Sequence, residues 1–120
     1  MFLLRPEYED ALNRSSWERF LQRGVQRLET SGPSRFRALS PARRLQWMRL
    51  ACELARSRYE LRTDRELMRF AFCCAYVGGA PPDFALPESV AAILSDRLQS
   101  GEARSLSAWE ESCRLVSVKG

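Results

Sequence analysis

The chain contains no histidine, and its 19 basic residues include only one lysine, Lys119. Histidine is the commonest general base and the usual partner of a serine or cysteine nucleophile, so its absence removes both arrangements. None of the four cysteines belongs to a Cys-x-x-Cys pair, and no histidine could complete a zinc site. Cys73 and Cys74 are adjacent and point to different faces of a helix, so they cannot easily bind one metal ion. We therefore expect no enzymatic activity, no bound metal and no cofactor, with the cysteines buried as small hydrophobic residues.

The chain also lacks a phosphate-binding loop, which would place glycines and a lysine ahead of a helix. Its Gly78-Gly79 pair instead follows an apolar run and precedes prolines, as expected where a helix ends. Adjacent carboxylates such as Glu110 and Glu111 do not converge on one point of a helix, so a solvated face is the better interpretation. Asp83 follows the prolines, and a turn or capping role is favoured there over catalysis.

Long hydrophobic runs are missing as well. The longest nearly uncharged run, residues 70–82, is well short of the ~20 residues that span a bilayer. The apolar part of the opening residues 1–7 is too short for a signal peptide. We therefore expect a cytoplasmic protein without membrane contact. The composition, with 45% hydrophobic and 28% charged residues, is ordinary for a globular protein, and 120 residues suit a single domain spanning residues 1–120.

What the sequence does have is helical periodicity, and the clearest helix follows Thr63. Glu66 lies three residues after this threonine, which is the spacing of a capping box. Residues 67–77 are apolar on nearly every face of a helix, as expected for a helix in the middle of a bundle. Gly78 can then take the left-handed cap conformation, and the following prolines prevent continuation. These signals predict a buried helix over Asp64–Val77.

Other segments repeat apolar residues at three and four positions, and no strand-like alternation competes with them. The sequence thus predicts an all-α fold, a compact bundle of five or six helices with the Asp64–Val77 helix buried at its centre. The first two predicted helices are separated by a break near Asn13–Ser16, and one bent helix is an open alternative. The further predicted helices begin at Pro6, at the Ser15-Ser16 cap (ending near Thr30), at Pro41 (ending near Tyr59), at Pro87 (ending at Ser100-Gly101) and at Ser107.

The positive charge is concentrated in the middle of the chain. Ten arginines and four acidic residues lie between Arg35 and Arg69, an excess of six positive charges, whereas the flanks are mildly acidic. An arginine bias of this scale is often a product of GC-rich coding. Nucleic-acid binding is one alternative for such a segment, but acids interrupt it and the helix after Thr63 is too apolar to lie exposed in a DNA groove. We favour an ordinary solvated surface, or a basic patch that faces an acidic protein.

Residues 59–84, followed by residues 87–98, resemble a group of small helical bacterial proteins encoded beside spike and adaptor genes of type VI secretion systems. In that group a helix ends with a Gly-x-x-Phe-Asp pattern, and a Pro-Trp-Ala-x-x-Ile-Leu helix follows. Here the glycine is doubled, and Ser89-Val90 stands where an aromatic residue is common. The resemblance covers about half of the chain and implies an accessory role in handling or loading an effector rather than catalysis.

These observations favour a non-catalytic protein-interaction module, an accessory or chaperone-like adaptor for a secreted effector. The first alternative is a small immunity-type inhibitor of a toxin enzyme, and the second is a nucleic-acid-binding helical protein. Aromatic residues and arginines dominate interface hot spots, so the candidate partner contacts are Arg35, Trp47 and Phe84, with Asp83 in the same loop as Phe84. Another protein is the expected partner, and a homodimer is an open alternative in which part of the apolar surface pairs with a second copy.

Overall fold

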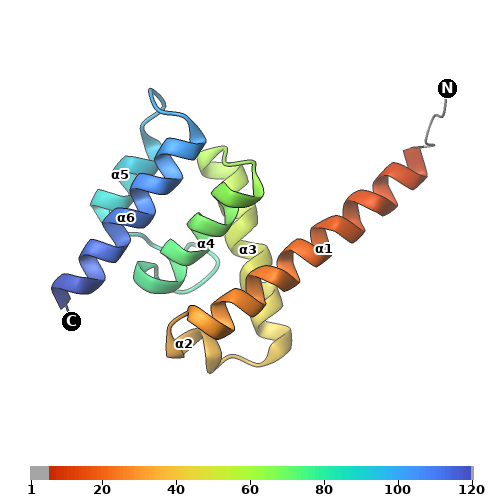
Figure 1. The fold of residues 1–120 in the computed structure, drawn as a ribbon, viewed down its shortest axis with the longest axis horizontal. Helices are drawn as coiled ribbons and strands as arrows, with labels where there is room; N and C mark the ends of the chain where they lie inside the picture. The colour runs from red at the N-terminus through yellow and green to blue at the C-terminus, as the bar shows by residue number, and fades with distance from the viewer. Residues whose placement is uncertain (1–5, 120) are drawn as a thin grey trace.

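The structure, a computed structural model, describes residues 6–119, and the side chains of residues 15–117 (Figure 1). Within this part of the chain there are six helices and no strand, which confirms the predicted all-α bundle. Residues 1–5, which open the segment considered for a signal peptide, lie outside the described residues. The helices are α1 (Pro6–Ser31), α2 (Ser34–Arg37), α3 (Pro41–Tyr59), α4 (Asp64–Val77), α5 (Glu88–Ser95) and α6 (Gly101–Lys119).

Helix α4 lies at the centre, as predicted, and packs against α1, α3 and α6. Its start is the expected cap: the Glu66 backbone N–H donates to Thr63 Oγ1 at 3.2 Å, and that hydroxyl donates to Glu66 Oε2 at 2.7 Å. The side chains of Phe70, Ala71 and Cys73 are fully buried. One stripe of the helix is not: Met68, Phe72 and Tyr76, four residues apart, are only half-buried.

The end of α4 differs from the prediction. Gly78 has φ −84° and ψ 161°, so it is extended rather than left-handed. A glycine is needed there because a Cβ would lie 2.7 Å from the carbonyl oxygen of Cys74. The left-handed cap occurs instead at the end of α3, where Glu60 has φ 55°.

Helix α1 is continuous, so the two segments form one helix, the alternative left open from the sequence; a break near Asn13–Ser16 is wrong, and the Ser15–Glu18 capping pattern lies inside the helix. Ser15 and Ser16 are exposed, and serine in an exposed helix position costs only a few tenths of a kcal/mol relative to good helix formers. The later half of α1 buries Leu21 and Leu28 in the core. Its first half extends away from the other helices (Figure 1).

The structure differs from the prediction at the last two helices: α5 is shorter than predicted, and α6 begins earlier in the chain. Helix α5 ends at Ser95, and Leu98, expected inside it, is 93% exposed in the connecting turn. Helix α6 begins at Gly101, which was expected to end a helix, and Ser100 caps it: its Oγ accepts from the Ala103 backbone N–H at 3.1 Å. Glycine suits this start because a Cβ would collide with the carboxylate of the buried Glu66.

None of the helices in the described part of the chain combines the length and the apolar character needed to cross a membrane. In the same part of the chain, no three or more cysteine, aspartate or glutamate side chains come together as potential ligands of a metal ion.

Candidate functional site

Two of the predicted partner contacts, Trp47 and Phe84, lie in the core, so neither side chain is available to a partner at the surface. Phe84 is 1% exposed and Trp47 is 9% exposed. The Trp47 ring meets Phe36 edge-on at 5.2 Å and Phe84 edge-on at 5.1 Å between ring centroids. These contacts hold both α2 and the loop after α4 against α3, and each pair adds about 0.5 to 1.5 kcal/mol beyond the burial of its area. Asp83, by contrast, is exposed in that loop.

Arg35 binds the end of α4 rather than projecting freely. Its Nε donates to the carbonyl of Ala75 at 2.9 Å, and its Nη2 donates to the carbonyls of Cys74 at 3.1 Å and Gly78 at 2.9 Å. The last carbonyls of a helix have no intrahelical partner and carry the negative end of its dipole, so a guanidinium is well suited to them. Arg35 therefore replaces the glycine cap that the sequence predicted.

Arg104 of α6 does the same for two other helices. It is 6% exposed, and its guanidinium donates to the carbonyls of Tyr59 at 2.8 Å and Leu94 at 2.7 Å, the ends of α3 and α5. A third bond runs from its Nε to Gln99 at 3.2 Å. One side chain thus joins the ends of α3 and α5 and the turn before α6. Hydrogen bonds to charged groups contribute about 1.5 to 3 kcal/mol each.

The arginines of the middle segment do not form one open basic face. Most of those between residues 35 and 69 bind carbonyls, carboxylates or a ring of the chain itself. The pairs include Arg37 with the carbonyl of Gly32, Arg44 with Glu29, Arg49 with Glu18, Arg56 over the Trp17 ring, and Arg65 and Arg69 with Glu102. This distribution weakens the nucleic-acid alternative, which needs arginines free to meet phosphates.

The cysteines offer no reactive centre in the core. Burial raises the pKa of Cys52 and of Cys73 to about 12, and it also raises the pKa of Cys74. A thiol with so high a pKa is almost wholly protonated near neutral pH and is a poor nucleophile. Cys113 is exposed, contrary to the expectation that all four cysteines are buried.

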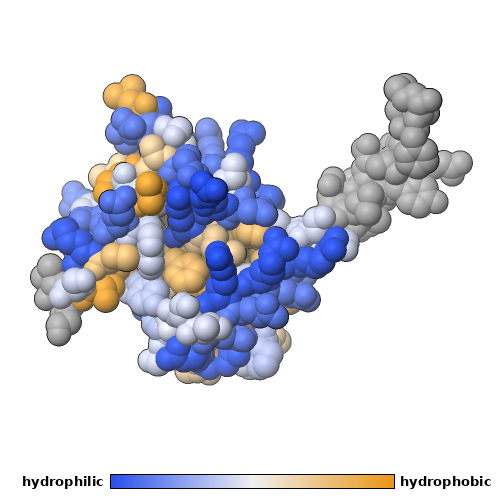
Figure 2. Space-filling model, viewed as in Figure 1, coloured by the Kyte–Doolittle hydropathy of each residue, from blue (hydrophilic) through white to orange (hydrophobic). Residues whose placement is uncertain are grey.

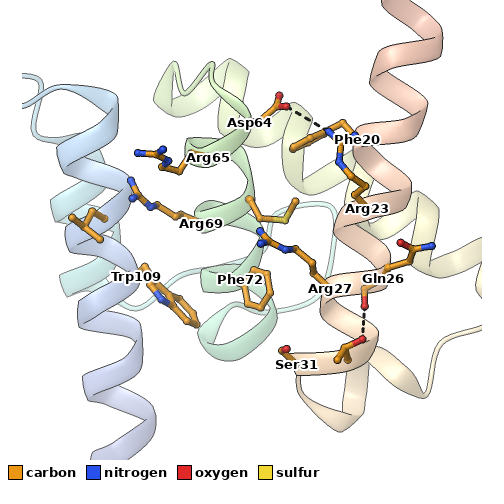
Figure 3. Close-up of a pocket in the computed structure, with 13 residues that line it drawn as sticks. Phe20, Arg23, Gln26, Arg27, Ser31, Asp64, Arg65, Arg69, Phe72 and Trp109 are labelled. Carbon is orange, nitrogen blue, oxygen red and sulfur yellow. Dashed lines mark hydrogen bonds and ion pairs between the residues drawn. The ribbon is translucent and has the colours of Figure 1, made fainter.

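An open groove lies over α4, with α1 and α6 as its walls (Figure 3). Its volume is about 970 Å³. We call it the α4 groove. Its lining residues come from three helices: Phe20, Arg23, Gln26, Arg27, Thr30 and Ser31 of α1, Asp64, Arg65, Met68, Arg69 and Phe72 of α4, and Leu106 and Trp109 of α6.

The floor of the α4 groove is apolar. Met68 and Phe72 belong to the half-buried stripe of α4, and Leu106 of α6 is 41% exposed. The Trp109 ring meets Phe72 edge-on, with ring centroids 5.5 Å apart and an interplanar angle of 73°. At one end the hydroxyl of Tyr76 donates to the carbonyl of Ser31 and joins α4 to α1. Figure 2 shows hydrophobic residues exposed at the centre of this face, with strongly hydrophilic residues on either side.

Arginines stand along both sides of this floor, and we call them the arginine rims. On the α4–α6 side Arg65 and Arg69 lie 3.1 and 3.0 Å from Glu102 Oε1. The hydrogen bond from Arg65 lowers the pKa of the Glu102 carboxyl, and Arg69 adds to the effect. On the α1 side Arg23 lies 3.7 Å from Asp64. Its neighbour Arg27 makes no ion pair with the described residues.

None of the residues on this floor was singled out from the sequence, although a signal for them exists. Met68, Phe72 and Tyr76 follow one another at intervals of four, and Arg65 and Arg69 lie three residues before Met68 and Phe72, beside this stripe. An apolar stripe bordered by a row of arginines is typical of a helix surface at the edge of a core, rather than of its middle. Comparisons of the chain with protein-family models, with curated proteins and with solved structures found no match.

Proposed function

We propose that this chain is a non-catalytic protein-interaction module that binds a segment of another protein in the α4 groove. The observation that carries the proposal is the incompletely buried floor, in which Met68, Phe72, Leu106 and Trp109 lie between rows of arginine. Contiguous exposed apolar surface rimmed by polar residues is typical of protein-binding sites. Tryptophan and arginine are also the residue types most enriched among binding hot spots.

The resemblance to small helical proteins encoded beside type VI spike and adaptor genes supports an accessory role within this function. A chaperone-like adaptor holds an apolar segment of its client until the client is loaded. A groove with an apolar floor and charged sides is suited to that task, because the floor contributes most of the affinity and the charges orient the segment.

The test compares two leucines that are both exposed. Leu106→Glu places a carboxylate on the floor of the α4 groove, whereas Leu98→Glu places one in the turn between α5 and α6, outside the groove. Each variant is expressed as the tagged full chain at native level in its own host, and the bound proteins are identified by mass spectrometry. We expect one partner to be lost with Leu106→Glu and retained with Leu98→Glu.

Two outcomes would contradict the proposal. One is a chain that purifies alone at native expression. The other is a partner that binds the Leu106→Glu chain as well as it binds the unmodified chain. Circular dichroism of both variants shows whether they keep their helical content, so that a loss of binding is not a loss of folding.

The immunity-type alternative has one observation in its favour, the excess of positive charge around the α4 groove, since inhibitors of toxin enzymes often present a charged surface that complements the enzyme. Deleting the gene separates the two functions. If a neighbouring toxin gene then kills its own host, the chain is an inhibitor; if the host survives and secretion of an effector falls, it is an adaptor.

A further inference from the structure

We infer that the segment bound in the α4 groove is an acidic amphipathic helix of about three turns. Its apolar face would cover Met68, Phe72 and Leu106, and its carboxylates would meet the arginine rims. The inference rests on the proposed function and narrows it to one class of ligand.

The length and walls of the groove favour a helix. Its α1 wall runs from Phe20 to Ser31, about 16 Å at 1.5 Å per residue, which matches three helical turns. The floor side chains are spaced by four residues on α4 and by three on α6, and these are the intervals at which a bound helix presents its own apolar anchors. An extended peptide would gain less, because helical walls offer no unpaired backbone edge for strand addition.

The charges around the groove favour an acidic ligand. The four arginines of the rims face two nearby carboxylates, Asp64 and Glu102, which leaves an excess of two positive charges. The ion pair of Arg23 with Asp64 is long and its side chains are 60% and 74% exposed, so it is weak. Arg27, one turn further along α1, has no ion pair with the described residues. A carboxylate of the ligand can therefore bind the α1 rim without displacing a strong internal partner.

The same residues suit single-stranded nucleic acid poorly. Bases stack on open aromatic faces, whereas Phe72 and Trp109 meet edge-on and cover part of each other. The remaining floor residues, Met68 and Leu106, are aliphatic. These features match the apolar face of a helix better than a row of bases.

The experiment selects ligands without assuming a partner. A displayed library of helical peptides of about five turns, with acidic, basic and apolar choices allowed equally at each varied position, is selected on the full chain. Binders of the Leu106→Glu chain are removed. We expect the enriched peptides to carry apolar residues at intervals of three and four, with aspartate or glutamate on both sides of that stripe.

Reversing one rim charge tests the electrostatic part. Arg27→Glu should weaken the selected peptides at least about tenfold, because a repulsion replaces an attraction, and a lysine in place of the facing peptide carboxylate should restore binding. Arg43→Glu, an exposed arginine outside the groove, is the matched control and should leave binding within about twofold. Binding should also weaken between about 50 and about 300 mM salt.

Four results would overturn the inference. They are enrichment of basic or uncharged helices, equal binding to the Arg27→Glu chain, tight binding of single-stranded DNA that competes with the peptides, and a dimer of the free chain that Leu106→Glu dissociates. The proposed function fails separately. If a natural partner depends on Leu106 but tolerates Arg27→Glu, the chain is still a protein-binding module and only the acidic-helix ligand is wrong.

Discussion

At the scale of single residues, the environment of two of the predicted partner contacts differs from what their residue types suggest. Trp47 and Arg35 belong to types that dominate interfaces, yet the first is buried between two phenylalanine rings and the second binds the carbonyl end of α4. Residue type is read from the sequence directly, but burial depends on which elements pack together. The sequence therefore indicated which residue types favour interfaces, but it did not show whether those side chains are buried or exposed.

The cysteines give a prediction at this scale. Burial raises the pKa of three thiols, so their thiolate forms are scarce at about pH 8 and their sulfur atoms are also inaccessible. Titration of the native chain with a thiol reagent that forms a mixed disulfide should modify only Cys113, which is exposed. The same titration in denaturant should modify all four cysteines. Rapid modification of a second thiol in the native chain would show that the core opens.

At the scale of elements, the sequence predicted the bounds of α3 and α4 well, whereas it misplaced the boundary between α5 and α6 and the conformation of Gly78. Thr63 and Ser40 both cap helices as expected, because a capping side chain and its helix are neighbours in the sequence. The carbonyls at the end of α4 bind Arg35, some 40 residues away. A contact of such long range is invisible to a local pattern, so the conformation of Gly78 could not be predicted. The start of α6 does have a local signal, the Ser100 cap, but the glycine that follows it was interpreted as the end of a helix.

Substitution of two serines distinguishes the observed start of α6 at Gly101 from the start predicted at Ser107. Ser100→Ala removes the side-chain cap of α6 and should lower the free energy of unfolding by about 1 kcal/mol. Ser107, expected from the sequence to begin the last helix, lies inside α6 and is exposed. Ser107→Ala should therefore change the free energy of unfolding by less than about 0.5 kcal/mol, in the stabilising direction. Denaturant unfolding followed by circular dichroism measures both, and the reverse order would place the start of α6 at Ser107.

At the scale of the whole molecule, the α4 groove exists because α1 and α6 both pack on α4 but not extensively on each other. Apolar periodicity predicted that α4 is central, and this is confirmed. It also indicated a helix covered on every side, whereas Met68, Phe72 and Tyr76 remain half-buried. How far two neighbours stand apart around a central helix depends on the packing of the complete bundle, so the groove could not be predicted from any one segment.

We therefore expect the buried side chains of α4 to determine the free energy of unfolding, and the side chains of the groove floor to contribute little to it. Leu67→Ala, at a fully buried position of α4, should lower the free energy of unfolding by about 2 to 5 kcal/mol. Leu106→Gln, on the floor of the α4 groove, should change it by less than about 1 kcal/mol, since this leucine is already 41% exposed. Both values come from denaturant unfolding. A cost for Leu106→Gln as large as that for Leu67→Ala would mean that the floor belongs to the core.

The arginines that bind helix ends also limit which substitutions the sequence tolerates. Replacing arginine by lysine conserves the charge, but a lysine ammonium lacks the planar fork that reaches several carbonyls at once. The exchange is harmless at an exposed position such as Arg43 and costly at Arg35 or Arg104, each of which binds three carbonyls. At these two of the 18 arginines, the planar shape of the guanidinium is therefore required as well as its positive charge.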